Sequence, residues 1–309
     1  MAHRIGIVGL GKITEDQHVP VLRKNSAFEI VAVASQRGLT VDGVKNTFRD
    51  WRDMLKMPGL EAVSVCTPPQ ARYEVARAAL EAGKHVLLEK PPTNTLGELI
   101  DLRDFAARKG VVLFQTWHSR YNEAVDEAKR ILAGQSVRTL NVTWKEDVRK
   151  WHPGQQWIWQ PGGYGVLDPG INALSIVTKI MPEPVFVKVA ELFFPANRAS
   201  PIAANLDLTS ASPRRWRAEF DWRQTSGETW TIDIVTDKDR VLKLERGGTK
   251  LTVDGKLIVE NPSEEYERIY ERFDELLNTG KPDVDEAPIR LVADAFLAGR
   301  RTIVEDFLD

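Results

Sequence analysis

Lys90 is the side chain in this sequence whose setting best suits proton transfer. It stands in Glu89-Lys90-Pro91-Pro92, directly after the apolar stretch His85–Leu88, so a strand end and two prolines would present it on a rigid support. A free lysine has a pKa of about 10.4 and is a poor base at neutral pH. Burial and a neighbouring positive charge would both disfavour the ammonium form and bring the pKa into a useful range. The same pattern also fits an exposed lysine after a strand.

A carboxylate and an amide form a second candidate pair, Asp168 and Asn172. Residues four apart share one face of a helix, so a helix that starts at Asp168 would present both side chains together. Asparagine cannot take up a proton at neutral pH, so proton removal would fall to Lys90, to Asp168 or to a relayed water. Asp168 also fits a capping role with Pro169 at the first helical position, and the two roles are compatible.

The stretch 144–159 interleaves four indole rings with hydrogen-bonding side chains such as Glu146 and His152. A saccharide suits such a lining, because its C–H faces pack on indoles while its hydroxyls need paired donors and acceptors. Part of the stretch must also form core, so any single tryptophan fits either role. The sequence therefore indicates a sugar-like ligand without assigning each ring.

A glycine turn, Gly9-Leu10-Gly11, follows the apolar stretch Arg4–Val8 and precedes a helical pattern. Gly9 and Gly11 occupy the first two glycine positions of G-x-G-x-x-G, and Thr14 occupies the third. Backbone at such a turn can approach a pyrophosphate, and the N–H groups and dipole of the following helix favour anions. The pattern predicts a dinucleotide site; a tight turn without a ligand is the alternative.

The residues after the second expected strand, Ser35-Gln36-Arg37-Gly38, bear on which dinucleotide binds. NAD-selective sites place an acidic residue there for the ribose 2′-hydroxyl, and this chain has none at that position. Arg37 can hold a 2′-phosphate and Ser35 can donate a hydrogen bond to it. We therefore expect NADP, with NAD also plausible, although an exposed loop arginine needs no ligand.

Cys66 is the one cysteine of the sequence, and it precedes Thr67-Pro68-Pro69 at the end of a third apolar stretch. Nothing in the sequence ties a base to it, so we expect a small apolar residue beside the cofactor rather than a nucleophile. One cysteine excludes an intrachain disulfide and indicates a reducing compartment.

Repeated strand–helix units are expected to position these residues in the first part of the chain. Such units predict an α/β fold with a doubly wound parallel sheet and right-handed crossovers. We assign residues 1–120 to an NAD(P)-binding Rossmann domain. The expected strands are Arg4–Val8, Phe28–Ser35, Ala62–Cys66, His85–Leu88 and Val111–Thr116, and the expected helices are 11–24, Trp51–Lys56, Arg72–Ala82 and Leu96–Arg108.

Strand patterns dominate after a helix at Tyr121–Leu132. Their alternation predicts a large, mainly antiparallel open sheet with one covered face, in a substrate-binding and oligomerisation α+β domain over 121–309. Helices are expected at Ser263–Leu277 and at about 289–304, the latter packing back on the first domain. The expected strands are Val137–Val148, Val185–Phe193, Arg214–Trp222, Thr229–Val235, Arg240–Glu245 and Thr249–Val253.

The composition is that of an ordinary globular protein. The chain has 309 residues, 42% hydrophobic and 28% charged, with a net charge of −2, so no general attraction to nucleic acid or anionic membrane is expected. No apolar run approaches the roughly 20 residues of a membrane span, and the chain enters a strand too early for a signal peptide. We expect a cytoplasmic protein, and no metal site is predicted.

Together these motifs resemble the Gfo/Idh/MocA oxidoreductase family over essentially the whole chain. Its hallmarks here are Gly9-Leu10-Gly11, Glu89-Lys90-Pro91 and the glycine-rich segment before Asp168. Within the family the sequence is most similar to bacterial D-galactose and L-arabinose 1-dehydrogenases. The stretches that carry this closer resemblance are Gly11-Lys12-Ile13, Asp16-Gln17-His18, 117–120, 144–148, 151–155 and 168–175.

The resemblance implies two domains, a nicotinamide cofactor and a catalytic pair of Lys90 and Asp168. The positive nicotinamide ring of the oxidised cofactor would then help to lower the lysine pKa. One departure matters: many members carry histidine four residues after the aspartate, where this chain has Asn172. The open ends of the parallel strands predict a ligand site in a cleft between the two domains.

The activity implied is oxidation of the anomeric carbon of D-galactose or L-arabinose, or both, to the lactone, with hydride transfer to NAD(P)⁺. The alternatives are a dehydrogenase or reductase of another sugar or inositol, or a non-catalytic dinucleotide-sensing regulator. A homodimer is expected. The predicted substrate contacts are Asn172, His118, Glu146, Trp151, His152 and Trp230, with Trp222 as a further lining candidate. The predicted cofactor contacts are Gly9, Gly11, Lys12, Ile13, Ser35, Gln36, Arg37, Cys66, Thr67, Pro68, Glu89, Lys90, Trp117 and His118.

Overall fold

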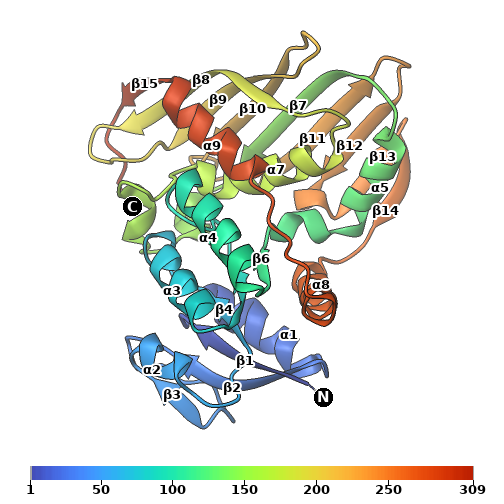
Figure 1. Cartoon of the computed structure of the whole chain (residues 1–309). Helices are drawn as coiled ribbons and strands as arrows, with labels where there is room; N and C mark the ends of the chain where they lie inside the picture. Colours follow the sequence, from blue (N-terminus) through green and yellow to red (C-terminus); the bar gives the residue numbers. More distant parts are fainter. Residues whose placement is uncertain (1, 309) are drawn as a thin grey trace. The chain divides into compact units, whose positions relative to one another are not determined.

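The computed structural model describes residues 2–308, and the chain divides into two compact units (Figure 1). Unit 1 takes the residues up to His118 together with Glu264–Glu286, and unit 2 takes Ser119–Ser263 and the residues from Ala287 onward. The segment that joins unit 1 from the C-terminal part is therefore 264–286. Residues 289–304, for which a helix is expected, belong to unit 2.

Unit 1 is built on a six-stranded sheet in the order β3-β2-β1-β4-β5-β6, with every pair parallel. This is the strand order of a doubly wound dinucleotide-binding sheet. All four residues of β4 are buried, which explains why its sequence is apolar apart from Ser64. The strands are β1 (His3–Val8), β2 (Phe28–Ala34), β3 (Asn46–Phe48), β4 (Ala62–Val65), β5 (His85–Leu88) and β6 (Leu113–Gln115).

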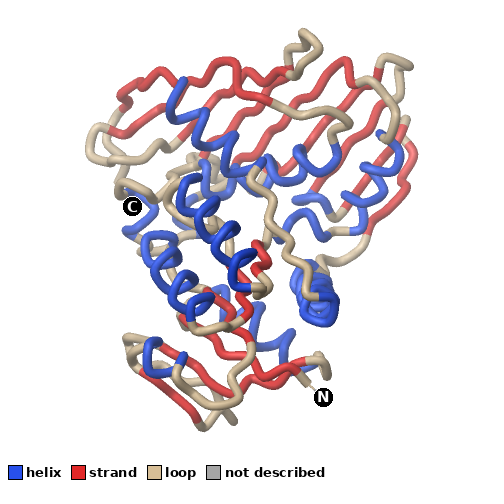
Figure 2. The backbone as a smooth tube through the Cα atoms, in the orientation of Figure 1, coloured by secondary structure: helices blue, strands red, loops and turns tan. Residues whose placement is uncertain are grey.

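The helices of unit 1 cover both faces of this sheet (Figures 1 and 2). Residues 12–24 are helical without interruption, with a π-helical turn η1 (Thr14–His18) before α1 (Val19–Lys24). Helix α8 (Glu265–Thr279) packs beside α1, and Phe273 on it stacks on Phe28 of β2. The remaining helices of the unit are α2 (Trp51–Leu55), α3 (Pro69–Glu81) and α4 (Leu96–Lys109).

Unit 2 contains a nine-stranded sheet in the order β14-β13-β12-β11-β7-β10-β9-β8-β15. The pairs β7·β10 and β8·β15 are parallel and the other pairs are antiparallel, as the prediction of a mainly antiparallel sheet requires. The strands are β7 (Val137–Lys145), β8 (Phe186–Pro195), β9 (Ala203–Thr209), β10 (Trp216–Asp221), β11 (Thr229–Thr236), β12 (Val241–Glu245), β13 (Lys250–Val253), β14 (Lys256–Glu260) and β15 (Gly299–Val304).

Three helices pack on one face of the nine-stranded sheet, as Figure 2 shows. They are α5 (Glu123–Leu132), α7 (Leu167–Ile180) and α9 (Ala287–Ala298). Alternation along β7 buries Leu140, Val142 and Trp144 beneath them. The shorter helical segments are η2 (His118–Tyr121), α6 (Val148–Trp151), η3 (Gln156–Trp159) and η4 (Arg246–Gly248).

Two local expectations are corrected by the structure. The helix expected at 289–304 ends at Ala298, and β15 then pairs in parallel with β8. Gly299 makes this change of direction, since a Cβ there would lie 2.3 Å from the Ala295 carbonyl oxygen. Asp168 does not cap α7, because the N-cap position is Val166 and Asp168 lies inside the first turn. Among the residues that the structure describes, no helix combines the length and the apolar character needed to cross a membrane.

The glycine turn offers a matched test of backbone constraint. Gly9 has φ +94°, and a Cβ there would lie 2.8 Å from the Thr67 backbone nitrogen, whereas a Cβ on Gly11 has no atom within 4 Å. We expect Gly9→Ala to lower the free energy of unfolding by about 1–3 kcal/mol because of strain and collision. Gly11→Ala should change it by no more than about 1 kcal/mol. Urea unfolding followed by tryptophan fluorescence measures both, and equal midpoints for the two variants would contradict this account.

Candidate active site

The turn between β1 and the first helix has the geometry that a dinucleotide requires. The Thr14 side chain is fully buried, and its hydroxyl donates a 2.8 Å hydrogen bond to the Gly9 carbonyl oxygen. Thr14 therefore replaces the third glycine of the fingerprint and ties the helix to the turn. Gly9 lies against the backbone of Cys66 and Thr67, so no side chain fits there.

The opposite side of the turn is open. A Cβ on Gly11 would point into unfilled space, and the helix that starts at residue 12 directs its N-terminus there. The buried Thr67 hydroxyl has no hydrogen-bond partner among the described residues. Strand order reverses at β1 and β4, where ligands bind in open α/β sheets. These residues fit a dinucleotide.

Arg37 is held beside this turn. Its Nη2 donates a 2.7 Å hydrogen bond to the Leu10 carbonyl oxygen, while the rest of its side chain is exposed. Ser35 is buried at the end of β2, and its carbonyl oxygen accepts a 2.9 Å hydrogen bond from the Gly38 N–H. The loop thus places a guanidinium next to the glycine turn. Lys12, by contrast, is exposed and paired with Asp16 at 2.5 Å.

The strand end at β5 carries Glu89 and Lys90. Glu89 is 2% exposed, and its Oε2 accepts a 2.9 Å hydrogen bond from the Lys90 backbone N–H. Arg72 donates to the carbonyl oxygens of Glu89, at 3.0 Å, and Pro91. The Lys90–Pro91 peptide bond is cis. Glu89 therefore serves to hold the backbone on which the half-buried Lys90 is carried.

Two further cofactor candidates of unit 1 are largely enclosed. Trp117 is 2% exposed, and its indole N–H donates to the Asp285 carbonyl oxygen at 3.0 Å. His118 Nδ1 lies 2.7 Å from Glu265 Oε2 on α8. Cys66 is buried, as expected of a small apolar residue. Of the remaining predicted cofactor contacts, Gln36 and Pro68 are exposed and Ile13 is half-buried.

Unit 2 brings a second group of predicted residues together around Glu146. This carboxylate is 3% exposed and accepts two indole N–H hydrogen bonds, from Trp222 at 3.3 Å and from Trp230 at 2.8 Å. The strand order of the sheet explains why Trp222 and Trp230 both reach Glu146. Strand β7 lies between β10 and β11, Trp230 pairs with Trp144, and the Glu146 N–H donates to the Asp221 carbonyl oxygen.

His152 connects this carboxylate to Asp168. The His152 ring lies 5.3 Å from the Trp222 ring, and its Nε2 is 3.5 Å from Asp168 Oδ2. Asp168 is 1% exposed in the first turn of α7, and the half-buried Asn172 follows one turn later. The predicted sharing of one helix face is therefore compatible with the helix that forms.

Two indole rings that contact Trp230 complete this group. The Trp230 ring lies 5.7 Å from that of Trp144 and 5.2 Å from that of Trp151. Trp144 is buried and acts as core, whereas Trp151 is 38% exposed. We call Glu146, Trp151, His152, Asp168, Trp222 and Trp230 the indole–carboxylate cluster. An exposed ring next to buried polar groups is a lining to which a sugar can bind.

Sequence reasoning missed the contribution of α8. Its Tyr266 donates a 2.9 Å hydrogen bond to Glu89 Oε1, and its Tyr270 hydroxyl lies 2.6 Å from His18 Nδ1. The helix was expected, but no local pattern indicates that it joins the first unit. The motif Asp16-Gln17-His18 was the one available signal that His18 has a special place.

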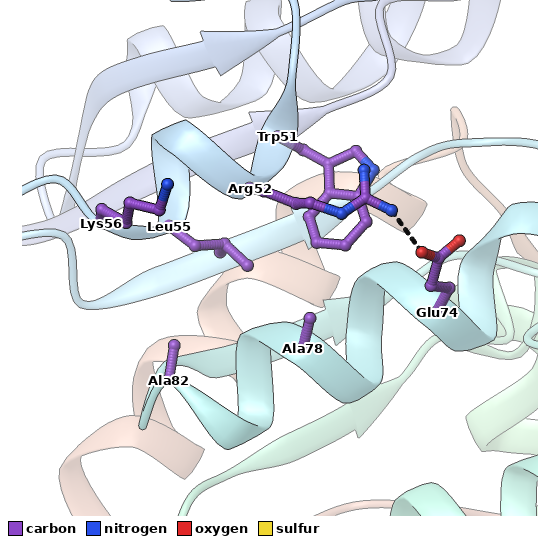
Figure 3. Close-up of a pocket in the computed structure, with 7 residues that line it drawn as sticks. All are labelled: Trp51, Arg52, Leu55, Lys56, Glu74, Ala78 and Ala82. Carbon is purple, nitrogen blue, oxygen red and sulfur yellow. Dashed lines mark hydrogen bonds and ion pairs between the residues drawn. The ribbon is translucent and has the colours of Figure 1, made fainter.

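A separate surface pocket of about 340 Å³ lies between α2 and α3 (Figure 3). Arg52 reaches from α2 to an ion pair with Glu74 on α3, and its guanidinium lies 4.2 Å from the Trp51 ring centre. Its charge is thus already compensated within the protein. None of the seven residues drawn in Figure 3 is among the predicted site residues.

Comparison with known proteins gives consistent matches. The family model GFO_IDH_MocA, described as an oxidoreductase family with an NAD-binding Rossmann fold, matches residues 3–116. Galactose 1-dehydrogenase of Pseudomonas fluorescens is 45% identical over 309 residues, which is 99% of each chain. The crystal structure of D-galactose-1-dehydrogenase from Rhizobium etli has a TM-score of 0.94 and 52% identity, covering 99% of this chain and 98% of that one. A 3-ketoreductase from Actinomadura kijaniata, solved with NADP and TDP-benzene, has a TM-score of 0.86 at 19% identity, covering 98% and 100%, and this likeness concerns the fold alone.

Proposed function

Because this chain belongs to the Gfo/Idh/MocA oxidoreductase family, we propose that it oxidises the anomeric carbon of D-galactose, and of L-arabinose, to the lactone. The two galactose dehydrogenases match almost the full length of the chain, which supports the substrate class. The pyranose forms of the two sugars differ only by a CH₂OH group at C5. One binding site serves both if it leaves room at that corner.

The indole–carboxylate cluster is the observation that carries the proposal. Glu146 accepts the indole N–H groups of Trp222 and Trp230, and an ionised carboxylate is the kind of acceptor that sugar hydroxyls require. The rings of Trp230 and Trp151 offer faces for sugar C–H groups. His152, His118 and Asn172 supply further hydrogen-bonding groups.

In the proposed reaction, Lys90 accepts the proton of the C1 hydroxyl, and Asp168 is the second member of the proposed catalytic pair. When bound, NAD(P)⁺ supplies the acceptor for the C1 hydride. The Gly9–Gly11 turn, with Thr67, would hold the pyrophosphate, and Arg37 with Ser35 would contact a 2′-phosphate. The amide of Asn172 cannot take the proton, so it is assigned to a substrate hydroxyl.

The proposal is tested by reduced-nicotinamide absorbance with D-galactose, L-arabinose, D-glucose, D-xylose and an inositol, each with NAD⁺ and NADP⁺. We expect the highest kcat/KM with D-galactose or L-arabinose, and a higher value with NADP⁺ than with NAD⁺. A higher kcat/KM with D-glucose, D-xylose or the inositol would instead indicate a dehydrogenase of that sugar or inositol within the same family. Cofactor binding without any sugar-dependent reduction would favour a dinucleotide-sensing regulator.

Removing the Lys90 amine should impair the chemical step and leave cofactor binding intact. We expect Lys90→Ala to lower kcat by about 10²–10⁴-fold, because general-base catalysis is lost, while cofactor binding remains measurable by fluorescence. Lys84→Ala is the control, since Lys84 donates to the Leu60 carbonyl oxygen just before β5 begins and has no proposed role. Near-normal turnover in Lys90→Ala would refute the assignment.

Arg37 should decide between the two cofactors. Loss of its charged hydrogen bonds to a 2′-phosphate should raise the KM for NADP⁺ at least about 10-fold in Arg37→Ala, with little change for NAD⁺. Arg23→Ala is the matched control, because Arg23 is likewise exposed and donates to a backbone carbonyl, that of Asp42. An equal effect on both cofactors would contradict a role in 2′-phosphate recognition.

The proposal also includes a cytoplasmic homodimer. The single cysteine, Cys66, is buried and needs no oxidising compartment. Light scattering on the purified protein measures the subunit number.

A further inference from the structure

A buried polar network in unit 1 joins the first helix, the end of β5 and α8. At its centre is His18, which closes the π-helical turn and is fully buried. Its Nε2 lies 3.1 Å from Glu89 Oε1, and its Nδ1 lies 2.6 Å from the Tyr270 hydroxyl. The three segments are far apart in the sequence, so this one ring connects them.

Glu89 relays the contact to the lysine that follows it. Oε1 is shared by His18 and the Tyr266 hydroxyl, whereas Oε2 accepts the Lys90 backbone N–H. Each carboxylate oxygen therefore faces a different side of the network. A shift of the Glu89 side chain would move the hydrogen bond that fixes the Lys90 backbone.

The positive charge of His18 and the negative charge of Glu89 stabilise each other. Burial alone would raise the pKa of Glu89, but the hydrogen bond and positive charge of His18 outweigh it and lower that pKa to about 2. Burial opposes charge on His18, yet the groups around it, Cys66, Tyr270 and Glu89, raise its pKa well above 6.5. Of these we assign the main effect to Glu89, which is the ionised group at neutral pH.

Other charged groups face the pair from neighbouring elements. His118 and Arg72 act on Glu89, and both lower its pKa. The Tyr270 hydroxyl also lies 3.0 Å from Ser64 Oγ, and either atom can be the donor. Nδ1 of His18 can thus donate to Tyr270 or accept from it, so the ring keeps a partner in either protonation state.

We propose that His18 is a positioning residue for Lys90: its imidazolium fixes the Glu89 carboxylate, which in turn holds the Lys90 backbone. This rests on the proposed function only in assigning the reaction that Lys90 serves. Loss of the charge would leave the carboxylate buried beside a neutral group, which is costly and favours its displacement. Small displacements of a reacting group cost large factors in rate.

A double-mutant cycle tests the coupling. We expect His18→Gln and Glu89→Gln each to lower kcat by about 10- to 100-fold, with the Kd of the cofactor and the KM of the sugar changed less than about 3-fold. The double variant should be no slower than the slower single variant, because both act through the same link. Multiplicative losses, or full kcat in folded His18→Gln, would overturn the inference.

Two matched variants control for a purely structural role. Tyr270→Phe removes the hydroxyl on the far side of the ring and leaves the His18–Glu89 contact, so kcat should stay within about 2-fold even if the melting temperature falls. Should His18→Gln not fold, Glu89→Gln decides, because it removes the charge of the carboxylate that His18 contacts. A kcat lowered at least about 10-fold at unchanged cofactor Kd supports the inference, and an unchanged kcat overturns it.

The charge itself has a readout that needs no turnover. A histidine whose pKa is raised by folding contributes stability that is complete below pH 6.5 and is lost as the pH rises through the raised pKa. The melting temperature of the wild type should therefore fall over that range, and that of His18→Gln should fall less. Equal slopes would overturn the charged pair. If the slopes differ as expected but no sugar is oxidised, the pair stands and the proposed activity fails.

Discussion

Within residues 2–308, three carboxylates are almost completely buried, and the need to compensate their charge organises the structure around them. Glu89, Glu146 and Asp168 are 2%, 3% and 1% exposed. A buried anion is tolerated only when donors or positive charges surround it. Groups from other parts of the chain donate to Glu89 and Glu146, and Asp168 Oδ2 lies 3.5 Å from His152 Nε2. The contacts that stabilise these buried carboxylates therefore also bring together the residues with candidate chemical roles.

The two units meet this requirement differently. Glu89 receives an imidazole and a phenol from helices on the faces of a parallel sheet, together with the N–H of the residue that follows it. Glu146 receives two indole N–H groups, which strands on either side of β7 bring to the same sheet end. The contacts of Glu89 include the backbone N–H of Lys90. The arrangement around Glu146 places a carboxylate beside indole rings, which are groups that can contact a sugar.

Much of the site could be predicted because its residues lie in local patterns. The glycine turn and Glu89-Lys90-Pro91-Pro92 each follow an apolar strand, and strand ends of a parallel sheet meet at one edge. Residue types predict Glu146, His152 and Trp230 as substrate contacts, and in unit 2 Glu146 binds Trp230 and Trp222 while His152 lies beside Trp222. The edge strands were harder. Strands β3, β14 and β15 each pair with a neighbour on one side only, so their sequences carry little alternation.

Local sequence patterns specify the glycine turn, the repeated strand–helix units and the residue types available for sugar chemistry. These are consequences of local backbone preference and hydrophobic periodicity, which neighbouring residues specify. Only the tertiary structure decided that α8 joins unit 1, that residues 299–304 form a strand beside β8, and that His18 contacts Glu89. Each of these depends on which buried polar group or strand edge finds a partner far away along the chain, and local preference carries no information about that choice.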